Sequence, residues 1–232
     1  EDISTASGLL KKELGMIGCS LLDLAEGARV PAGHALAVDR EVFSRLVASE
    51  ISRRDRIRYV SGEQKDLDVP RPCIIATGPL TSDSMSGSIL EMFGRGVMHF
   101  YDAISLSVAL ESIDTSRMFK ASRYGRGGDD YWNVPLDESE YATLVDFLRK
   151  APRSERHDFE DGRCFEACLP VEVAADRGED VLRFGPLRPR GLPDPATGTE
   201  PYAVIQLRQE SLSGSMLGLV GFQTRMTRPG QR

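Results

Sequence analysis

The sequence predicts a mixed α and β fold, because stretches with a helical period alternate with short apolar runs typical of strands. Between residues 7 and 29, apolar residues recur at steps of four and three, which places them on one face of a helix. Residues 73–76 form a short apolar run typical of a buried strand, and residues 202–208 and 216–222 read as an antiparallel hairpin. With 232 residues and 41% hydrophobic content, the chain can bury a sizeable core as one large domain or two smaller ones.

In the first hundred residues, elements are predicted from the spacing of apolar residues and from the proline and glycine residues that interrupt it. One helix is predicted over residues 7–29, followed by a break at Pro31 and Gly33 and a short strand over residues 35–38. Asp39 is a good N-cap for a second helix that turns its apolar face inward. Residues 57–60 are predicted as a strand, residues 61–72 as a loop or hairpin and residues 73–76 as a fully buried strand. A third helix follows, with its apolar face turned inward at Met85, Ile89, Met92 and Phe93.

The second half shows clearer local signals. Residues 104–110 alternate as in a half-buried strand. Asp137 and Glu140 form a capping box for a helix whose inner face carries Tyr141, Leu144, Val145 and Leu148. A short helix is predicted over residues 170–177, with Pro170 at its first position and Gly178 closing it in a left-handed conformation. Residues 182–195 are rich in proline and glycine, and we expect a loop without helix there.

The segment CFEACLPVE, residues 164–172, is the candidate site of chemistry, because Cys168 stands just ahead of this short helix. Unpaired N–H groups at the start of a helix stabilise a thiolate, which lowers the pKa of the thiol and makes it a nucleophile near neutral pH. The alternative is a small, packed and inert cysteine, and spacing alone leaves both open.

A second candidate region is rich in basic and aromatic residues. Between residues 117 and 133, arginines and a lysine interleave with aromatic rings around flexible glycines, and Arg123, Tyr124 and Arg126 lie at its centre. Basic groups attract phosphate and rings stack on unpaired bases, so this loop is a candidate RNA or flavin surface. Arg188 belongs to a rigid proline-rich loop that suits phosphate contact. The alternatives are a solvated glycine loop and a surface loop whose arginines pair with nearby acids.

Composition limits the class of protein. The formal net charge of −6 and a sequence pI near 5.2 give no global argument for a nucleic-acid partner, so such a partner must be held locally. Four cysteines in a chain of this length argue against a disulfide framework and fit a reducing cytoplasm. Cys164 and Cys168 lack further metal-ligand partners, and we expect no metal site. No apolar stretch is long enough to cross a membrane, and the acidic, polar residues 1–8 predict no signal peptide.

The segment FEACLPVE, residues 165–172, resembles the FEGCMPIE segment of the TrmFO (Gid) family, the folate- and FAD-dependent tRNA uracil-5-methyltransferases. The same order continues through VPAGHALAVDR (30–40), IIATGPLTS (74–82), ASRYGRGGDDYWNVPLD (121–137), LRFGPLRPRGLPDPATG (182–198), PYAVIQLRQE (201–210) and LVGFQT (219–224). Together these segments cover most of the chain and are highly specific.

This resemblance implies a function, cofactors and site residues. It implies methylation of carbon 5 of the T-loop uridine of tRNA, with methylenetetrahydrofolate as carbon donor, FAD as redox cofactor and NAD(P)H as reductant. It gives Cys168 a catalytic role, places Asp39 and Arg40 near the flavin, and likens the apolar strand that ends in Ala-Thr-Gly, with Thr77 and Gly78, to a flavin-binding signature. It implies a tRNA partner for the basic loops, a cytoplasmic location and no membrane association.

The resemblance also implies a division of the chain. Residues 1–38 and 73–100 resemble part of a glutathione-reductase-type FAD-binding domain, and residues 39–72 and 101–232 resemble an insertion domain. The family's Gly-rich FAD fingerprint and final flavin-domain segment have no counterpart, so we expect a fragment or processed piece that is inactive alone.

The sequence departs from the family at six positions, and other functions stay open. Ser105 and Leu106 replace alanine-proline, Ala109 replaces an acid, Val134 replaces a cysteine, and Leu217 and Gly218 replace tyrosine-asparagine. These changes would permit a diverged, non-catalytic RNA-binding or flavoprotein fragment of the same fold. A related flavoprotein that acts on the tRNA wobble position is a further alternative.

Overall fold

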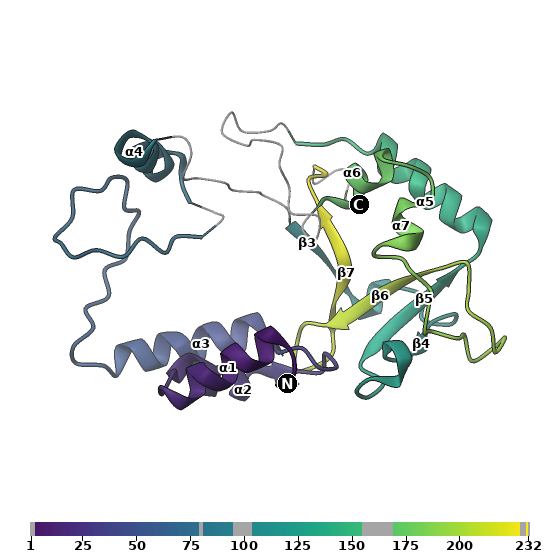
Figure 1. Cartoon of the computed structure of the whole chain (residues 1–232), viewed down its shortest axis with the longest axis horizontal. Coiled ribbons are helices and arrows are strands. Elements are labelled where there is room, and N and C mark those ends of the chain that lie inside the picture. Colours follow the sequence, from purple (N-terminus) through teal and green to yellow (C-terminus); the bar gives the residue numbers. More distant parts are fainter. Residues whose placement is uncertain (1–2, 79–80, 95–103, 155–168, 228–230, 232) are drawn as a thin grey trace.

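The fold is mixed α and β, as the sequence predicts (Figure 1). The computed structural model describes residues 3–78, 81–94, 104–154, 169–227 and 231. In chain order the elements are α1 (Ala6–Met16), α2 (Ser20–Gly27), β1 (Arg29–Val30), β2 (Ala37–Val38), α3 (Arg40–Ser52), α4 (Asp83–Phe93), β3 (Ile104–Ala109), η2 (Leu110–Ser112), β4 (Phe119–Lys120), η3 (Arg123–Gly125), β5 (Tyr131–Leu136), α5 (Glu138–Lys150), α6 (Val171–Asp176), α7 (Val181–Phe184), β6 (Ala203–Gln209) and β7 (Met216–Thr224). Among the described residues, no helix is both long and apolar enough to cross a membrane.

The first helix is two helices. The prediction of one continuous helix over residues 7–29 is wrong, because α1 ends at Met16 and α2 begins at Ser20. Gly18 lies between them with φ +78°, a left-handed conformation that closes a helix, and Cys19 is extended as the N-cap of α2. Because the apolar residues continue at helical spacing across the break, periodicity alone does not reveal it.

Helix α3 begins as the sequence predicts. Asp39 is its N-cap, and its Oδ1 accepts from the backbone N–H groups of Glu41 and Val42, both at 3.0 Å. The apolar face of α3 is only half-buried, however, and no residue of the helix is fully buried. Part of that face lines an open pocket of about 620 Å³ together with Ile57 and Tyr59.

Two predicted strands in this region are absent. Residues 57–60 and 73–76 are irregular chain in the structure, and the Ile74 side chain is 91% exposed. The prediction of a buried strand over residues 73–76 is therefore wrong. A strand exists only where a neighbouring strand pairs with its backbone, and neither described sheet contains these residues. Residues 61–72, predicted as a loop or hairpin, are a loop in the structure.

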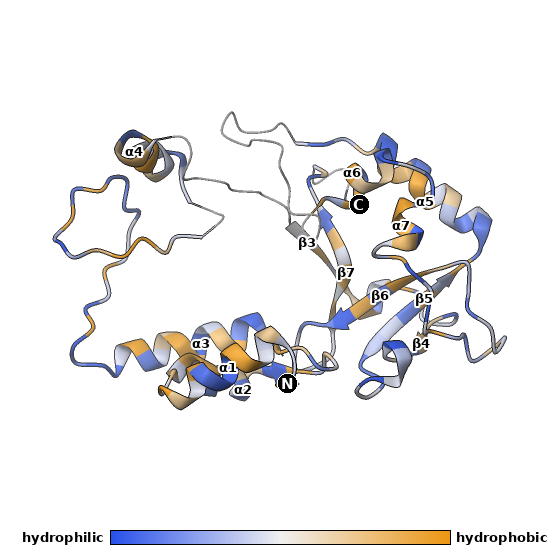
Figure 2. Ribbon diagram, viewed as in Figure 1, coloured by the Kyte–Doolittle hydropathy of each residue, from blue (hydrophilic) through white to orange (hydrophobic). Residues whose placement is uncertain are grey.

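Helix α4 follows this irregular chain and lies apart from the other described helices (Figure 1). Ser82 caps it, and Met85 is buried, as the predicted inner face requires. Met92 and Phe93 are exposed, against the prediction that they point inward. Figure 2 shows apolar residues along α1, α3 and α4, where few side chains are covered.

A five-stranded antiparallel sheet dominates the rest of the chain, which we call the sheet domain (residues 104–154 and 169–227). Its strand order is β3-β7-β6-β5-β4. The predicted hairpin is confirmed, because β6 and β7 pair antiparallel with Leu207 opposite Leu219. The predicted strand at residue 104 is β3, which pairs with β7 through an irregularity between Ser105 and Ser107.

The core of the sheet domain lies where α5, α6 and α7 meet the strands. The capping box of Asp137 and Glu140 is confirmed, and Tyr141, Val145 and Leu148 on the inner face of α5 are buried. They pack in one cluster with residues of α6, α7, β6 and β7, including Val171, Leu182, Ala203 and Phe222. This cluster holds most of the buried apolar side chains among the described residues.

Helices α6 and α7 differ from the predicted helix over residues 170–177 and the predicted loop over residues 182–195. Pro170 is the N-cap of α6 and Val171 is its first residue, one position later than predicted. Arg177 ends the helix in a right-handed conformation, and Gly178 does not have the predicted positive φ. Residues 182–184, predicted as loop, belong to α7. The prolines that argue against helix all follow Phe184, so a single turn fits before them.

Candidate functional site

Two residues separate helix α6 from Cys168, the candidate nucleophile of the sequence analysis. Cys168 and Cys164 lie outside the described residues, and Cys168 stands two positions before the N-cap Pro170. Helix α6 itself is held firmly. The Arg149 Nε donates to the Ala175 carbonyl at 2.9 Å, and Arg153 forms an ion pair with Asp176. The chain that follows Cys168 is therefore fixed against α5.

Glu172 is a buried carboxylate that sequence reasoning treats only as a first-turn acid. Its side chain is fully buried. Its Oε2 accepts from the Thr224 hydroxyl at 3.0 Å, and its Oε1 accepts from the Arg225 backbone N–H at 2.7 Å. These bonds join the first turn of α6 to the end of β7. The sequence does contain a signal for this burial. Glu172 stands between two valines in a short helix of mostly apolar residues, where a side chain is expected to be buried.

Asp39 and Arg40 lie where the N-terminal helices meet the sheet domain. The Asp39 Oδ2 accepts from the Leu212 N–H in the β6–β7 turn at 2.9 Å. The N–H groups of Val42, Leu212 and Glu41 hold the pKa of Asp39 below its ordinary value. The Arg40 guanidinium pairs with Glu210 at 3.4 Å while 77% of its side chain stays exposed. Both residues therefore fasten α3 to the hairpin, and Arg40 also faces solvent.

The Glu210 side chain lies against Gly218, one of the positions at which the sequence departs from the family. Its Oε2 accepts from the Ser107 hydroxyl at 2.6 Å, in addition to the ion pair with Arg40. A Cβ on Gly218 would collide with the Glu210 carboxylate. The glycine at this position thus permits the glutamate to bridge β3 and α3.

Thr77 and Gly78 lie elsewhere. They belong to exposed chain before α4, where the Thr77 hydroxyl contacts the Thr81 hydroxyl at 2.6 Å. Gly78 has φ +74°, and a Cβ placed on it would meet nothing within 4 Å. Figure 1 shows this segment near α4, away from the β6–β7 turn that Asp39 contacts. The structure does not bring the four expected flavin contacts together.

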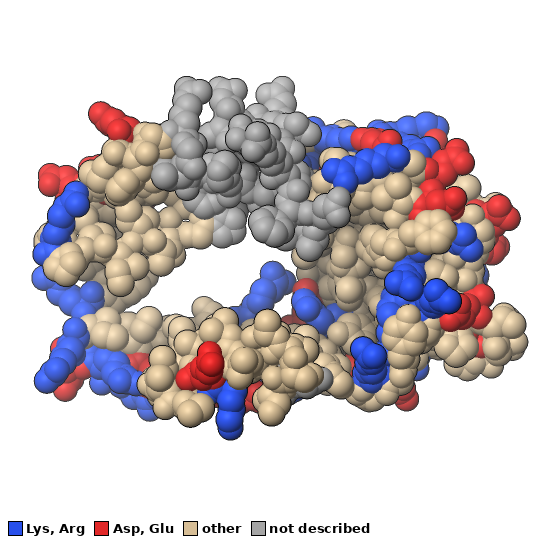
Figure 3. Space-filling view, in the orientation of Figure 1, with Lys and Arg blue, Asp and Glu red and all other residues tan. Residues whose placement is uncertain are grey.

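Arg123, Tyr124, Arg126 and Arg188 are brought together. The 3-10 turn η3 meets the loop between α7 and β6, and the Tyr124 N–H donates to the Gly191 carbonyl at 2.9 Å. Tyr124 is exposed, and the Arg126 guanidinium lies 5.8 Å from its ring centre. Arg188 is exposed on the facing loop. Figure 3 shows Lys and Arg atoms gathered on the viewer-facing side of the sheet domain.

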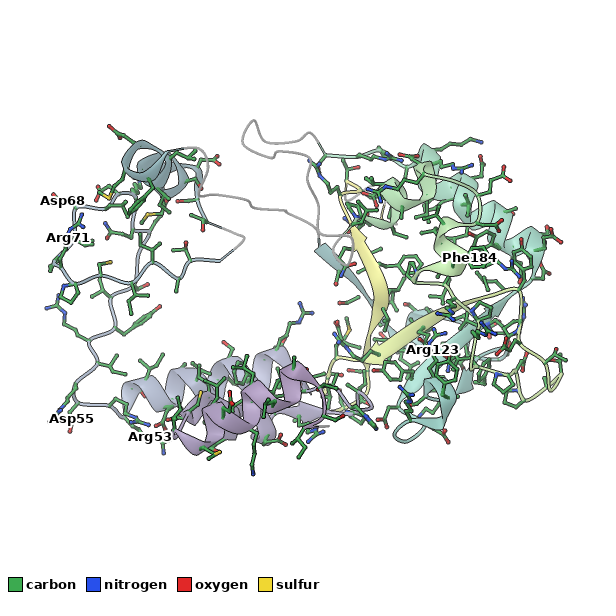
Figure 4. The ribbon with its side chains drawn as sticks, in the orientation of Figure 1. Arg53, Asp55, Asp68, Arg71, Arg123 and Phe184 are labelled. Atoms are coloured by element: carbon green, nitrogen blue, oxygen red, sulfur yellow. The ribbon has the colours of Figure 1, made fainter. Side chains whose placement is uncertain are left out.

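Arg123 has a different environment from its neighbours. One Nη donates to the carbonyls of Arg188 at 2.6 Å and Arg190 at 2.9 Å, and the other donates to Gln206 Oε1 at 2.8 Å. Its guanidinium therefore braces the facing loop on β6. Figure 4 labels Arg123 and Phe184, both of which lie in the sheet domain.

The close approach of the two loops depends on a glycine. Gly191 has φ +80°, and a Cβ there would lie 2.6 Å from the Tyr124 ring. Tyr124 is itself in a left-handed conformation at φ 59°. Such a conformation is uncommon for a residue with a side chain and is often found at binding sites. Sequence reasoning missed Gly191 and also Phe184, the exposed aromatic residue at the end of α7.

Comparisons with known proteins match nearly the whole chain. A family model described as glucose inhibited division protein A matches residues 3–232. The methylenetetrahydrofolate–tRNA-(uracil-5-)-methyltransferase TrmFO of Anaeromyxobacter dehalogenans (strain 2CP-C) is 52% identical over 229 residues, which are 98% of this chain and 51% of that protein. The proteins of the same name from Moorella thermoacetica and Aquifex aeolicus are 50% and 46% identical over 97% and 100% of this chain, which cover 51% and 52% of their lengths. The chain spans about half the length of the curated relatives it matches.

Proposed function

The chain belongs to the glucose inhibited division protein A family, and on that premise we propose that it is part of a tRNA uracil-5-methyltransferase that uses methylenetetrahydrofolate. The observation that carries this proposal is 46–52% identity, over nearly the whole chain, to proteins named for that activity. Because the chain spans about half of them, the activity is proposed for the protein in which both halves are present.

The sheet domain is the proposed tRNA-contacting part. The exposed Tyr124 ring with Arg126 above it supports this role, as does Arg188 on the facing loop. Aromatic rings stack on unpaired bases and guanidinium groups pair with phosphates. Arg123 contributes by bracing that loop, since its described bonds all reach protein acceptors.

Cys168 is the proposed catalytic thiol. Carbon 5 of uracil is a poor nucleophile until a group adds at carbon 6. Addition of a thiolate at carbon 6 gives an enolate whose carbon 5 bonds to the methylene carbon of methylenetetrahydrofolate. A base then removes the carbon 5 proton as the bond from that carbon to the folate nitrogen breaks, so tetrahydrofolate leaves and an exocyclic methylene remains on carbon 5. Addition of a hydride equivalent to this methylene makes the methyl group, and the thiolate leaves as the double bond between carbons 5 and 6 re-forms. Reduced FAD, when bound in the complete protein, would supply the two electrons. A role for Cys168 in proton transfer is the alternative within the same proposal.

FAD is the proposed redox cofactor of the complete protein, with NAD(P)H as its reductant. Thr77 and Gly78 stand in exposed chain before α4, whereas Asp39 contacts the β6–β7 turn, so these four expected contacts lie in two separate places among the described residues. We therefore assign no step of the reaction to flavin contacts of this chain. We retain the expected division, in which residues 1–38 and 73–100 belong to the flavin domain and the remainder to an insertion domain, together with a cytoplasmic location.

A chimera tests the activity. In it, this chain replaces the matching half of the Anaeromyxobacter dehalogenans relative, and methyl transfer to a tRNA transcript is measured. We expect activity, and loss of activity by roughly a thousandfold or more in Cys168→Ala. Cys73→Ala, at an exposed cysteine, is the matched control. A chimera that binds tRNA without methylating it would instead favour a diverged RNA-binding module.

Thiol labelling separates a reactive cysteine from a packed one. In the Cys164→Ser chain, iodoacetamide should modify Cys168 faster than Cys19 and Cys73, with a midpoint below the free-thiol pKa of about 8.5. Equal labelling rates, together with normal methylation by Cys168→Ala, would make Cys168 a packing residue.

A further inference from the structure

The end of α7 and the loop that joins it to β6 present an aromatic ring and several arginines around one cavity. Arg183, Phe184, Arg188, Pro189, Arg190 and Glu200 line a cavity of about 360 Å³. The Phe184 side chain, at the end of α7, is 73% exposed. A cavity of this composition offers an apolar surface and positive charge side by side.

The positive charge at this cavity is largely uncompensated. Arg188 and Arg190 make no ion pair with a carboxylate in the described parts of the chain. Glu200 is the acid that lines the cavity, and its Oε1 already accepts from the Gly191 N–H at 2.7 Å. On a chain of formal net charge −6, a local excess of arginine is suited to an anionic ligand.

The Phe184 ring is the outer end of a column of contacting side chains. The Arg183 guanidinium lies 5.8 Å from the centre of the Phe184 ring and 4.1 Å from the centre of the Tyr202 ring. The Arg183 Nε donates to the Tyr202 carbonyl at 2.9 Å. Tyr202 in turn packs edge-on against Tyr141, with ring centres 5.5 Å apart. The column runs from the core to the surface and fixes Arg183 behind the exposed ring.

The backbone that carries the arginines is held in place before any ligand binds. Arg123 donates to the carbonyls of both Arg188 and Arg190, and the Arg188 N–H donates to the Gly185 carbonyl at 3.3 Å. Leu187, within this loop, is fully buried and so anchors the loop in the core. Binding at a preformed loop loses little conformational entropy, so these contacts suit recognition of a ligand.

We propose that this surface binds an unpaired nucleotide of RNA, with its base stacked on the Phe184 ring and its neighbouring phosphates paired with Arg188 and Arg190. The inference rests on the proposed function, in which the RNA is tRNA. Every base offers a π face and every nucleotide carries a phosphate, so an exposed ring beside free guanidinium groups matches both parts of the ligand. An enzyme that acts on uracil must also have its base outside the helical stack, which leaves unpaired nucleotides near the site.

The test uses the 232-residue chain and a stem-loop RNA that carries 2-aminopurine at successive loop positions. Stacking on Phe184 should quench the fluorescence at one position. Phe184→Ala should abolish that quenching and weaken binding about 5-fold or more, without a change in the salt slope. Phe184→Trp should retain both the quenching and the affinity for RNA. Arg190→Ala should weaken binding and reduce the salt slope by roughly 0.7–1, the change for one phosphate contact.

Two variants control for nonspecific loss. Phe147→Ala removes an exposed ring on α5, and Lys150→Ala removes an exposed cation from the same helix. Neither should change quenching or salt slope. Circular dichroism and thermal unfolding exclude loss of the fold in each variant.

The outcomes separate this inference from the function on which it rests. If the wild-type chain binds the RNA, but Phe184→Ala binds equally well with the same quenching, the inference is overturned and the tRNA proposal stands. If the wild-type chain binds no RNA, the inference is overturned, and the methyl-transfer assay of the chimera tests the tRNA proposal separately. If Phe184→Ala and Arg190→Ala alter flavin retention by the chimera while RNA affinity is unchanged, the cavity belongs to a cofactor and the inference is also overturned.

Discussion

At the scale of single residues, Glu172 shows how a local signal acquires a long-range role. The glutamate stands in the first turn of α6, where an acid is favoured by the helix dipole. Its carboxylate nevertheless faces the core, and both oxygens accept bonds from the end of β7. A buried carboxylate remains in a folded core only with such partners. Glu172 thereby ties the segment that follows Cys168 to the sheet.

Replacing Glu172 should lower stability strongly. Glu172→Ala leaves the Thr224 hydroxyl and the Arg225 N–H without their acceptors, and each such loss costs roughly 1–3 kcal/mol. Glu172→Gln keeps one acceptor and should lose less. Urea unfolding measures the free energy of unfolding, with Glu179→Ala, at an exposed glutamate nearby, as control. Equal midpoints for Glu172→Ala and Glu179→Ala would show that the buried bonds contribute nothing.

At the scale of elements, helix α5 is set by its N-terminal cap. The Glu140 N–H donates to Asp137 Oδ1 at 2.8 Å, and the Asp137 N–H donates to Glu140 Oε2 at 3.0 Å. Arg117, from the segment before β4, pairs with the same Glu140 carboxylate. This arrangement lowers the pKa of Glu140 to about 2, chiefly through the Arg117 hydrogen bond and then through the Asp137 N–H.

The low pKa of Glu140 predicts a pH-dependent contribution to stability. Because the folded-state pKa is below the unfolded value of 4.5, the stabilisation is fully present above pH 4.5 and is lost as pH falls towards about 2. The pair is partly exposed, so its contribution should stay below about 1 kcal/mol.

Unfolding of wild type and Glu140→Gln across pH measures this contribution, and NMR titration of the Glu140 carboxyl measures its pKa directly. Wild type should exceed the variant in stability at neutral pH and converge with it near pH 2. Glu138→Gln, in the same turn of α5, is the control and should show no such convergence. A titration midpoint near 4.5 for Glu140 would contradict the prediction.

At the scale of the whole molecule, two parts of the chain differ in how much of their apolar side-chain surface is buried. The sheet domain buries a continuous cluster from α5 to β7. Residues 3–94 leave many large apolar side chains exposed, among them Met16, Ile17, Tyr59, Val60 and Ile74. Apolar surface of this extent is typical of a region that another segment or chain covers. This contrast agrees with a chain that spans about half of its relatives.

Limited proteolysis should reveal that division. Residues 54–78 have few buried side chains and no described strand or helix, so trypsin should cut first after Arg58 and Lys65. Lys120 and Arg149, in the sheet domain, should be cut far more slowly. Mass spectrometry of a time course identifies the sites. Addition of the part of the Anaeromyxobacter dehalogenans relative that this chain does not match should slow the early cuts. Equal rates at all four sites would refute the division.

The sequence by itself determined the elements whose signals are local. The N-cap at Asp39, the capping box before α5 and the β6–β7 hairpin were all predicted, because caps, helical periods and turns depend on residues a few positions apart. The family, too, was predicted from ordered motifs. Cys168 stays a prediction, since it lies outside the described residues.

Only the tertiary structure decided the features that depend on contacts between residues far apart in the sequence. Residues 73–76 have the composition of a buried strand, but a strand forms only where another strand supplies hydrogen bonds, and none of the described strands pairs with them. The meeting of Tyr124 with Gly191 and the bonds from Glu172 to β7 join residues more than fifty positions apart. Such contacts are set by the packing of whole elements, which no local pattern in the sequence encodes.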